Sequence, residues 1–251
     1  MLLLFRTICK PAFMKQLFLS ILLISSGLFL QAQQTVNDPL AEKRTVGSFH
    51  GIEVGTGIEL LLSQGTSEEV AVSASTAEFR DKIVTKVEKG VLKIQYESKT
   101  GAVNRKNETK GLKAYVSCKT LDQLYATTGA HVKISGVLQS PSLDMKANTG
   151  AEISGKVALG SLQLDQNTGS KVTLTGTTEK MELEGSTGSK FTGDDMTANT
   201  CKIEVSTGAR LLVHVAKELQ VKASTGGTVK YKGEAGIRPI KTNTGGAVSR
   251  I

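Results

Sequence analysis

The chain has 251 residues, a formal net charge of +8 and only 4% aromatic residues, with four tyrosines and no tryptophan. Proteins that bind single-stranded nucleic acids stack the bases on aromatic side chains, so this composition, in a chain that starts with an export signal, argues against a nucleic-acid partner. Residues 1–32 carry three of the basic residues and no acid, which leaves 28 − 23 = +5 on the rest of the chain.

The N-terminus has the pattern of a secretory signal peptide. Lys15 provides a basic head, Leu17 to Leu30 form a short apolar run, and small residues follow, so cleavage is expected after Ala32. The run is shorter than the roughly 20 apolar residues that span a bilayer, which disfavours a membrane anchor. Translation starts at either Met1 or Met14. We therefore expect an exported protein, in the periplasm, on the cell surface or secreted.

A polar linker is predicted over residues 33–44 and an N-terminal β region over residues 45–120. Residues 49–62, with Gly55-Thr56-Gly57 at their centre, have the pattern of a hairpin or of a first irregular coil. A hairpin is expected where residues 83–87 and 91–96 flank the Lys89-Gly90 turn. This region should cap the repeats that follow and cover their first sheet edge.

Residues 121–251 contain one tetrapeptide seven times, at glycine spacings of 18 to 21 residues. Its central residues are Thr128-Gly129, Thr149-Gly150, Thr168-Gly169, Thr187-Gly188, Thr207-Gly208, Thr225-Gly226 and Thr244-Gly245. Each pair is preceded by Asn, Ser or Thr and followed by Ala, Ser or Gly. So constant a period is typical of a stacked repeat architecture.

The residues around these turns alternate as in β-strands. Five residues before and three residues after each glycine, the side chain is apolar in every copy, and polar residues lie between the apolar positions. The glycine suits the third position of a type II turn, where φ is positive. Each repeat should hold two strands of about six residues and a looser return marked by a second glycine in five copies (Gly136, Gly155, Gly176, Gly193 and Gly233). The sequence therefore predicts an all-β fold, a single-stranded β-helix with about 19 residues per coil.

Residue types that often carry chemistry do not cluster in this sequence. His50, His131 and His214 occupy different repeat columns, and no serine or cysteine lies near a His-acid pair in the sequence. Asp194-Asp195, the acidic pair of the repeats, is expected in a solvated return loop. Cys118 and Cys201 should lie too far apart for a disulfide and act as small core residues. We predict no catalytic residues, no metal site and no cofactor.

The turn threonines should form a ladder with a rise of about 4.8 Å per coil. Ice-binding solenoids use such ladders, but they present two parallel rows on a flat strand, whereas these threonines form one row at a turn. A structural turn ladder is the favoured interpretation. Arg105-Lys106 and the basic residues two positions after the turn glycines provide positive charge that attracts acidic polymers.

The segment Phe49-His50-Gly51-Ile52-Glu53-Val54-Gly55-Thr56-Gly57, the strand Val91-Leu92-Lys93-Ile94 and the seven Thr-Gly turns resemble the head GIN domain family, auto-transporter adhesins of Bacteroidetes and their relatives. The resemblance covers residues 45–251 and implies a right-handed β-helix related in shape to pectin-lyase-like proteins. It implies a non-enzymatic adhesin-like domain that presents a binding surface at the cell envelope. The alternatives are a periplasmic glycan- or lipid-binding protein and, less favoured, a polysaccharide-acting enzyme.

The expected partner is a glycan or protein at a cell surface. The chain ends six residues after the last turn glycine, and an uncovered last coil has an unpaired strand edge. We therefore also expect self-association through the C-terminal end of the solenoid.

Overall fold

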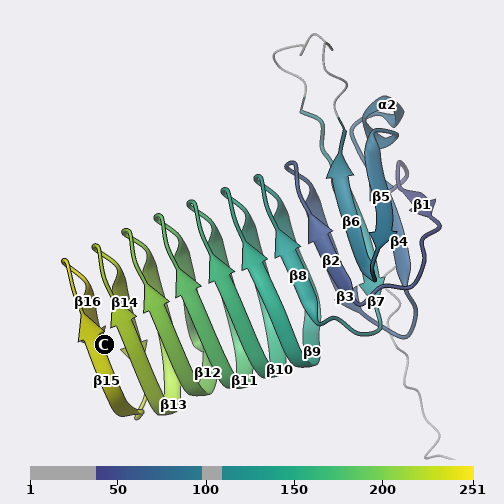
Figure 1. The fold of residues 1–251 in the computed structure, drawn as a ribbon. Helices are drawn as coiled ribbons and strands as arrows, with labels where there is room; N and C mark the ends of the chain where they lie inside the picture. Colours follow the sequence, from purple (N-terminus) through teal and green to yellow (C-terminus); the bar gives the residue numbers. More distant parts are fainter. Residues whose placement is uncertain (1–37, 98–108) are drawn as a thin grey trace, which may run out of the picture. The chain divides into compact units, whose positions relative to one another are not determined.

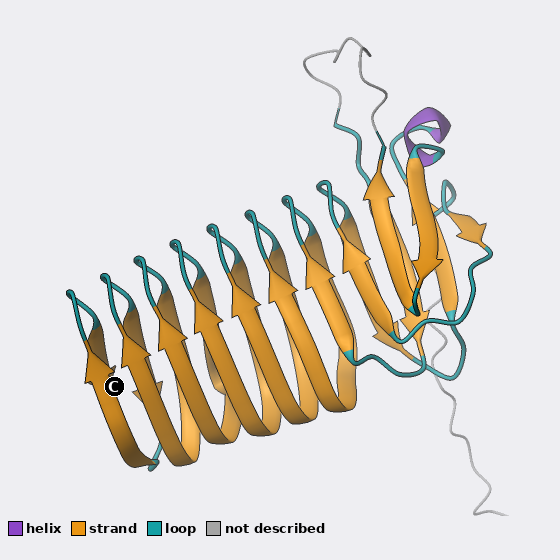
Figure 2. Ribbon diagram, viewed as in Figure 1, coloured by secondary structure: helices purple, strands orange, loops and turns teal. Residues whose placement is uncertain are grey.

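The structure, a computed structural model, describes residues 38–97 and 109–251. The expected signal peptide, the start of the linker and Arg105-Lys106 lie outside the described residues. Apart from one short helix, the described elements are β-strands in a single hydrogen-bonded sheet that coils on itself (Figure 1; Figure 2). Residues 38–251 form one unit.

The regular coils are built from strands that pair in parallel with the equivalent strands of neighbouring coils. They are β8 (Gln123–Ala126), β9 (His131–Ala147), β10 (Glu152–Gln166), β11 (Lys171–Gly185), β12 (Lys190–Val205), β13 (Arg210–Ala223), β14 (Thr228–Lys232), β15 (Gly236–Thr242) and β16 (Ala247–Arg250). Equivalent positions of successive repeats are in register, as for Leu162 with Met181 and Met181 with Cys201. The β-solenoid predicted from the repeats is confirmed.

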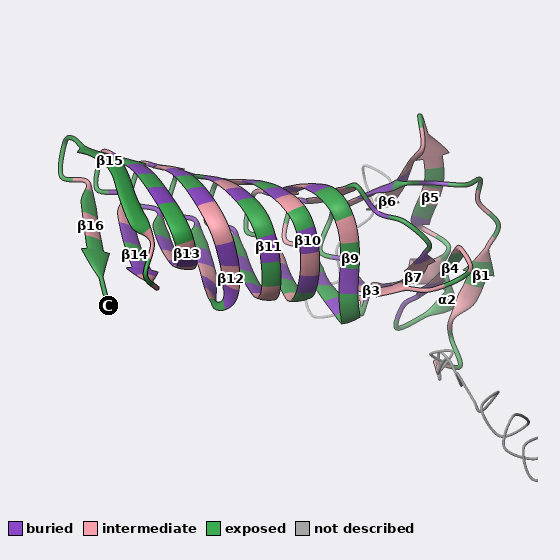
Figure 3. Cartoon of the chain, turned by 90° about the horizontal axis from the view of Figure 1, so that it is seen from below, coloured by how far each residue is buried: buried purple, intermediate pink, exposed green. Residues whose placement is uncertain are grey.

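Each coil has two sheet surfaces joined at the Thr-Gly turn. We call the surface formed by the strand segments before the turns the pre-turn face, and that formed by the segments after them the post-turn face. In Figure 1 the turns line up along the upper edge of the coils. The apolar columns on both sides of the turns point inward and are buried from Leu124 to Val229 (Figure 3). The alternation in the sequence thus builds one continuous core.

The prediction of a type II turn is wrong. Threonine and glycine both have positive φ in every turn, for example 48° at Thr168 and 69° at Gly169, and a type II turn needs a negative φ at the threonine. Positive φ at both central positions is the pattern of a type I′ turn. The N–H of the fourth turn residue donates to the carbonyl of the first, as from Ser170 to Asn167 at 3.1 Å.

The far side of each coil differs from the expected loose return. Strands β9 to β13 continue from one Thr-Gly turn to the next over 14 to 17 residues, with shifts of register near the second glycines. Asp194 and Asp195 therefore lie within β12, not in a loop, and the expectation of a solvated return loop is wrong. The ladder is interrupted at these two residues, because the register against β11 shifts between Thr192 and Met196 and the register against β13 shifts between Gly193 and Thr197.

The N-terminal region contributes coils of its own, out of sequence order. Strands β2 (Gly51–Val54) and β3 (Glu59–Gln64) flank an eighth turn, at Thr56-Gly57, and pair in parallel with β8 and β9. Of the two alternatives for this segment, the structure has the first coil. On its other side, β6 (Val91–Tyr96) and β7 (Lys113–Cys118) add one more pair of parallel strands.

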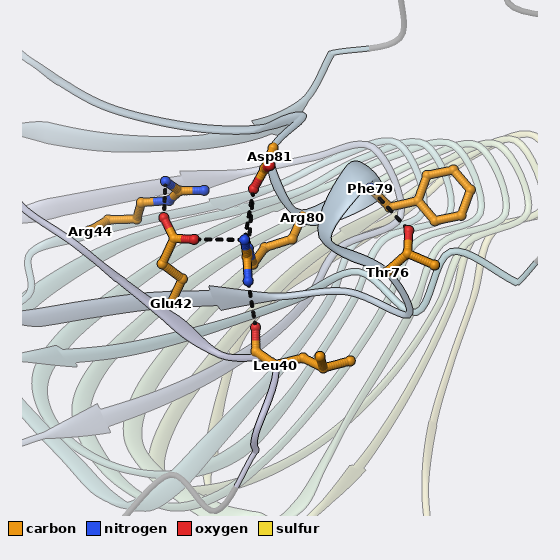
Figure 4. A network of polar contacts seen from close by, with 7 residues as sticks. All are labelled: Leu40, Glu42, Arg44, Thr76, Phe79, Arg80 and Asp81. Atoms are coloured by element: carbon orange, nitrogen blue, oxygen red, sulfur yellow. Dashed lines mark hydrogen bonds and ion pairs between the residues drawn. The ribbon is translucent and has the colours of Figure 1, made fainter.

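Antiparallel strands end the sheet on the N-terminal side. β4 (Glu69–Ser73) pairs with β7 and with β1 (Glu42–Arg44), and β5 (Ile83–Glu88) forms the predicted hairpin with β6. β1 lies inside the range expected as linker. The Arg80 guanidinium, at the end of helix α2 (Ala77–Arg80), contacts Glu42 at 2.8 Å and the Leu40 carbonyl at 3.5 Å, and so ties β1 to the helix (Figure 4).

The C-terminal coil is the least buried part of the solenoid. All of β15 is exposed, including Ile237 and Ile240, and its register against β13 shifts next to Pro239. Self-association through this end stays a prediction.

Candidate functional site: the turn ridge and its groove

Eight threonines form an exposed row along the turn edge of the coils, which we call the turn ridge. Its members are Thr56, Thr128, Thr149, Thr168, Thr187, Thr207, Thr225 and Thr244. Each turn glycine except the last donates its N–H to the carbonyl oxygen of the threonine in the next coil, at 2.9 to 3.2 Å. These hydrogen bonds fix the spacing of the ridge, so that its hydroxyl and methyl groups repeat once per coil.

The ridge threonines are held in a backbone conformation that does not suit them. Their φ values lie between 45° and 59°, where a β-branched residue clashes with its own backbone. Strain of this kind costs about 1–3 kcal/mol per residue. Asn, Asp or Gly at this position of a type I′ turn would avoid most of it. Stability alone therefore does not explain why threonine occupies all eight turns.

A second polar row accompanies the ridge at the first position of the turns. Asn167 Oδ1 accepts hydrogen bonds from the Thr168 backbone N–H at 2.8 Å and from Ser186 Oγ in the next coil at 3.0 Å. Asn243 Oδ1 is similarly 3.3 Å from Thr244 Oγ1. Because these side chains hold the turn and one another, the ridge presents its hydroxyls from a rigid support.

A groove of about 490 Å³ runs beside the ridge on the pre-turn face and crosses five coils. Its lining residues come from equivalent positions of successive repeats: Lys146, Asn148, Asp165, Gln166, Asn167, Glu184, Gly185, Ser186, Glu204, Val205, Ser206, Lys222 and Ser224. The lining combines amide, hydroxyl, carboxylate and ammonium groups. Such a groove can exchange hydrogen bonds with an extended polar ligand that lies along the solenoid axis.

The middle of the groove is acidic. Asp165, Glu184 and Glu204 are in register on adjacent coils. Lys146 lies 3.9 Å from Asp165, and Lys222 lies 3.2 Å from Glu204. Among the described residues, no cation lies within 4.0 Å of the Glu184 carboxylate. Glu184 is therefore the acceptor of this column that is most open to a hydroxyl or amine of a ligand.

The three histidines are far apart in the fold, but two of them have acidic partners that the sequence analysis missed. His50 Nδ1 lies 2.7 Å from Asp122, and His131 Nδ1 lies 3.3 Å from Glu152. The second pair could have been found, because both residues lie two positions after a turn glycine in adjacent coils. His214 contacts the Thr197 hydroxyl at 3.4 Å. In the part of the chain that the structure describes, neither His-acid pair has a nucleophilic side chain hydrogen-bonded to its imidazole.

Asp194 and Asp195 do not act together either. Asp194 forms an ion pair with Lys232 at 3.0 Å, and this hydrogen bond is the main reason that the pKa of Asp194 is lowered. Asp195 is exposed on the same strand. Of the two carboxylates, Asp194 is thus the one held by an ion pair.

Cys118 and Cys201 are buried and free, as predicted. Burial raises the pKa of the Cys118 thiol to about 11, and burial also raises the pKa of Cys201. Both are therefore protonated thiols at neutral pH, which makes them poor nucleophiles.

Within residues 38–97 and 109–251, no group of three His, Cys, Asp or Glu side chains is arranged to hold a metal ion. None of the described helices has the length and apolar character needed to span a bilayer.

Comparison with solved structures finds the same fold in adhesin-like proteins. A "putative adhesin" from Bacteroides fragilis is similar with a TM-score of 0.74 and 18% identity, over 84% of this chain and 96% of that one. A second "putative adhesin", from Parabacteroides merdae, is similar with a TM-score of 0.65 and 16% identity, over 84% and 95% of the two chains.

A "putative lipid binding protein" from Parabacteroides distasonis is similar with a TM-score of 0.60 and 16% identity, over 86% of this chain and 98% of that one. No curated protein matches the chain. The model of the family described as "Putative auto-transporter adhesin, head GIN domain" matches residues 48–235. The match covers most of the chain, including seven of the eight Thr-Gly turns, and the chain therefore belongs to this auto-transporter adhesin head GIN domain family.

Proposed function

We propose that this protein is an exported, non-enzymatic binding domain of the adhesin type, which contacts a ligand at the cell envelope through the turn ridge and the groove beside it. The observation that carries the proposal is the strained threonine in all eight turns. A turn that served stability alone would lose nothing by having Asn at that position. Strain that is kept in a rigid, exposed row is typical of a surface used for contact.

The adhesin label of the family and of two of the similar structures supports this proposal. Export is supported by the sequence of residues 1–32. The polar lining of the groove favours a hydroxyl-rich or charged ligand over an acyl chain, because buried apolar area is what holds a lipid tail. A lipid-binding role, suggested by one similar structure, is therefore the weaker alternative.

The non-enzymatic part of the proposal rests on the distribution of the reactive groups. Catalysis needs unlike polar groups that converge on one point of a partly dry site. In the described chain the two His-acid pairs, Asp194 and the two thiols lie apart, and the groove is an open, repetitive surface.

The experiment compares two sets of substitutions in four adjacent ridge turns. One variant carries Asn, and the other carries Ser, at all four positions: Thr149, Thr168, Thr187 and Thr207. Asn removes the hydroxyl and relieves the strain, whereas Ser keeps the hydroxyl. Binding is measured on a panel of neutral and acidic polysaccharides and extracellular-matrix proteins, beside thermal unfolding.

We expect the Asn variant to unfold at the same temperature as the unchanged protein or higher, yet to lose binding, and the Ser variant to keep most of it. Equal binding by all three proteins would contradict a contact role for the ridge. Release of new reducing ends from any polysaccharide, abolished by changing Asp194 and Asp195, would instead establish an enzyme.

A further inference from the structure

The net charge of the chain is concentrated at one end of the solenoid. Residues 190–251 contain ten Lys and Arg and five Asp and Glu, so their net charge is 10 − 5 = +5. Residues 38–189 contain eighteen of each sign and are neutral overall. The C-terminal coils are therefore the part of the protein that attracts a polyanion.

Four cations mark a line, which we call the basic line, that leads across the post-turn face into this part: Lys171, Lys190, Arg210 and Lys230. The first three occupy one column, because Lys171 pairs in register with Lys190 and Lys190 with Arg210. Lys230 lies on the next coil, two residues further along the strand than the Arg210 column. All four side chains are exposed.

Only one of the four cations of the basic line has a nearby counter-charge. Lys171 forms an ion pair with Glu152 at 2.8 Å. Among the described residues, no carboxylate lies within 4.0 Å of Lys190, Arg210 or Lys230. Like charges directly opposite each other on adjacent strands are destabilising. A bound anion would relieve this repulsion, so the arrangement favours a ligand that brings negative charge.

The neighbourhood of the line indicates the kind of polyanion. Thr173 and Thr192 lie two residues beyond Lys171 and Lys190, so two hydroxyls lie beside these charges, and the same column continues with Leu212 and Lys230. The four tyrosines lie elsewhere: Tyr96, Tyr115 and Tyr125 are in β6, β7 and β8, and Tyr231 is buried. This surface therefore offers no aromatic platform for nucleic-acid bases. Hydroxyls beside regularly spaced cations fit a sugar polymer with acidic groups.

We infer that the basic line is the docking site for a linear acidic polysaccharide that lies along the solenoid axis. Its carboxylates or sulfates would meet Lys190 and Arg210 on adjacent coils, about 4.8 Å apart, and Lys230 one coil further and two residues along the strand. Its hydroxyls would exchange hydrogen bonds with Thr173 and Thr192. This inference rests on the proposed binding function and adds a second contact surface, on the post-turn face, to the turn ridge and its groove.

The experiment measures the affinity of the chain for polygalacturonate, with neutral dextran as the uncharged probe, at about 50 and about 200 mM salt. The test variant is Lys190→Gln with Arg210→Gln. The matched control is Lys202→Gln with Lys217→Gln, which removes the same charge from exposed sites of the same coils, outside the basic line. Both variants should fold, because all four side chains are exposed.

We expect binding to polygalacturonate and not to dextran, weakened by salt, and reduced about tenfold or more by the test variant but only slightly by the control. The loss is expected because each of these two side chains donates charge-assisted hydrogen bonds to the acidic groups of the polymer. Equal losses in the two variants, or no binding to polygalacturonate, would overturn the inference. Duplex DNA and phosphatidylglycerol vesicles are measured under the same conditions, and tighter binding to either of them than to polygalacturonate would also overturn the inference.

The proposed function can be judged separately. If polygalacturonate does not bind but another ligand of the panel does, and the Thr→Asn changes in the ridge weaken it, the adhesin-type function stands without this ligand class.

Discussion

The side-chain amide of Gln166 donates a hydrogen bond of 3.0 Å to the backbone carbonyl of Lys190, across the inside of the solenoid. Gln166 lies on the pre-turn side of one coil and Lys190 on the post-turn side of the next, so this bond joins the two sheet surfaces. Gly185 occupies the Gln166 position in the next coil. The polar side chain of Gln166 thus fits into an apolar column because the residue at this position in the next coil, a glycine, has no side chain.

Changing Gln166 to Ala should destabilise the protein by about 2–3 kcal/mol, because it leaves a cavity above Gly185 and removes the donor from the Lys190 carbonyl. Chemical denaturation provides the measurement. Gln163, exposed on the same strand, is the matched control and should tolerate Ala within about 0.5 kcal/mol. Equal effects at the two positions would show that the inner hydrogen bond is unimportant.

Replacing Ser170 or Ser189 with alanine should stabilise the folded protein. Their hydroxyls are buried and lack hydrogen-bond partners, and Ala130, Ala151 and Ala209 occupy the same column in other coils. Burying an unpaired hydroxyl costs about 1–3 kcal/mol. Each Ser→Ala change should therefore raise the melting temperature. A lower melting temperature would mean that these hydroxyls have a partner, such as a buried water.

Gly176 should be far less replaceable than Gly169, although both have positive φ. A Cβ at Gly169 meets nothing within 4 Å, so Gly169→Ala costs only backbone strain, about 1–2 kcal/mol. A Cβ at Gly176 would collide with the backbone carbonyl of Val157 in the neighbouring coil. We expect Gly176→Ala to prevent folding or to lower stability by several times as much. Similar melting temperatures for the two variants would contradict the packing of the coils.

The thiols of Cys118 and Cys201 should resist alkylation at pH 8 until the protein unfolds. Burial raises the pKa of Cys118 to about 11, so the folded state favours the neutral thiol. The resulting stabilisation is complete below the unfolded thiol pKa, about 8.5, and is lost as the pH rises through about 11. Mass spectrometry after iodoacetamide treatment, with and without denaturant, tests this. Rapid labelling of the folded protein would be inconsistent with the burial of these cysteines.

The coils could be predicted from the sequence because two independent features repeat with the same period, the Thr-Gly pairs and the inward apolar columns. The turn type could not be predicted, because backbone propensities favour a positive φ for glycine but not for a β-branched residue such as Thr168. Hydrogen bonds between neighbouring turns, which require the other coils to be in place, add to those within the turn and help to hold that threonine where it lies.

The arrangement of the N-terminal region was also beyond the sequence pattern. Nothing in residues 65–118 indicates that β6 and β7 pass to the far side of the first coil, because strand pairing across so long a separation has no local signal. The groove was missed for a different reason. From the alternation of apolar and polar residues, lining residues such as Glu184 and Gly185 can be recognised only as outward-facing or small. The lining is also assembled from five coils.

The out-of-order first coil has a consequence for the speed of folding. Neighbouring regular coils pair residues about 19 positions apart, as for Leu162 and Met181, whereas Glu59 pairs with His131 across 131 − 59 = 72 positions. Closing the longer loop costs about 1 kcal/mol more in chain entropy. Folding should therefore start among β9 to β13 and spread by local contacts, while the N-terminal strands join last. The rate at which the whole domain becomes native is then limited by the arrival of its first residues, after its last ones are already in place.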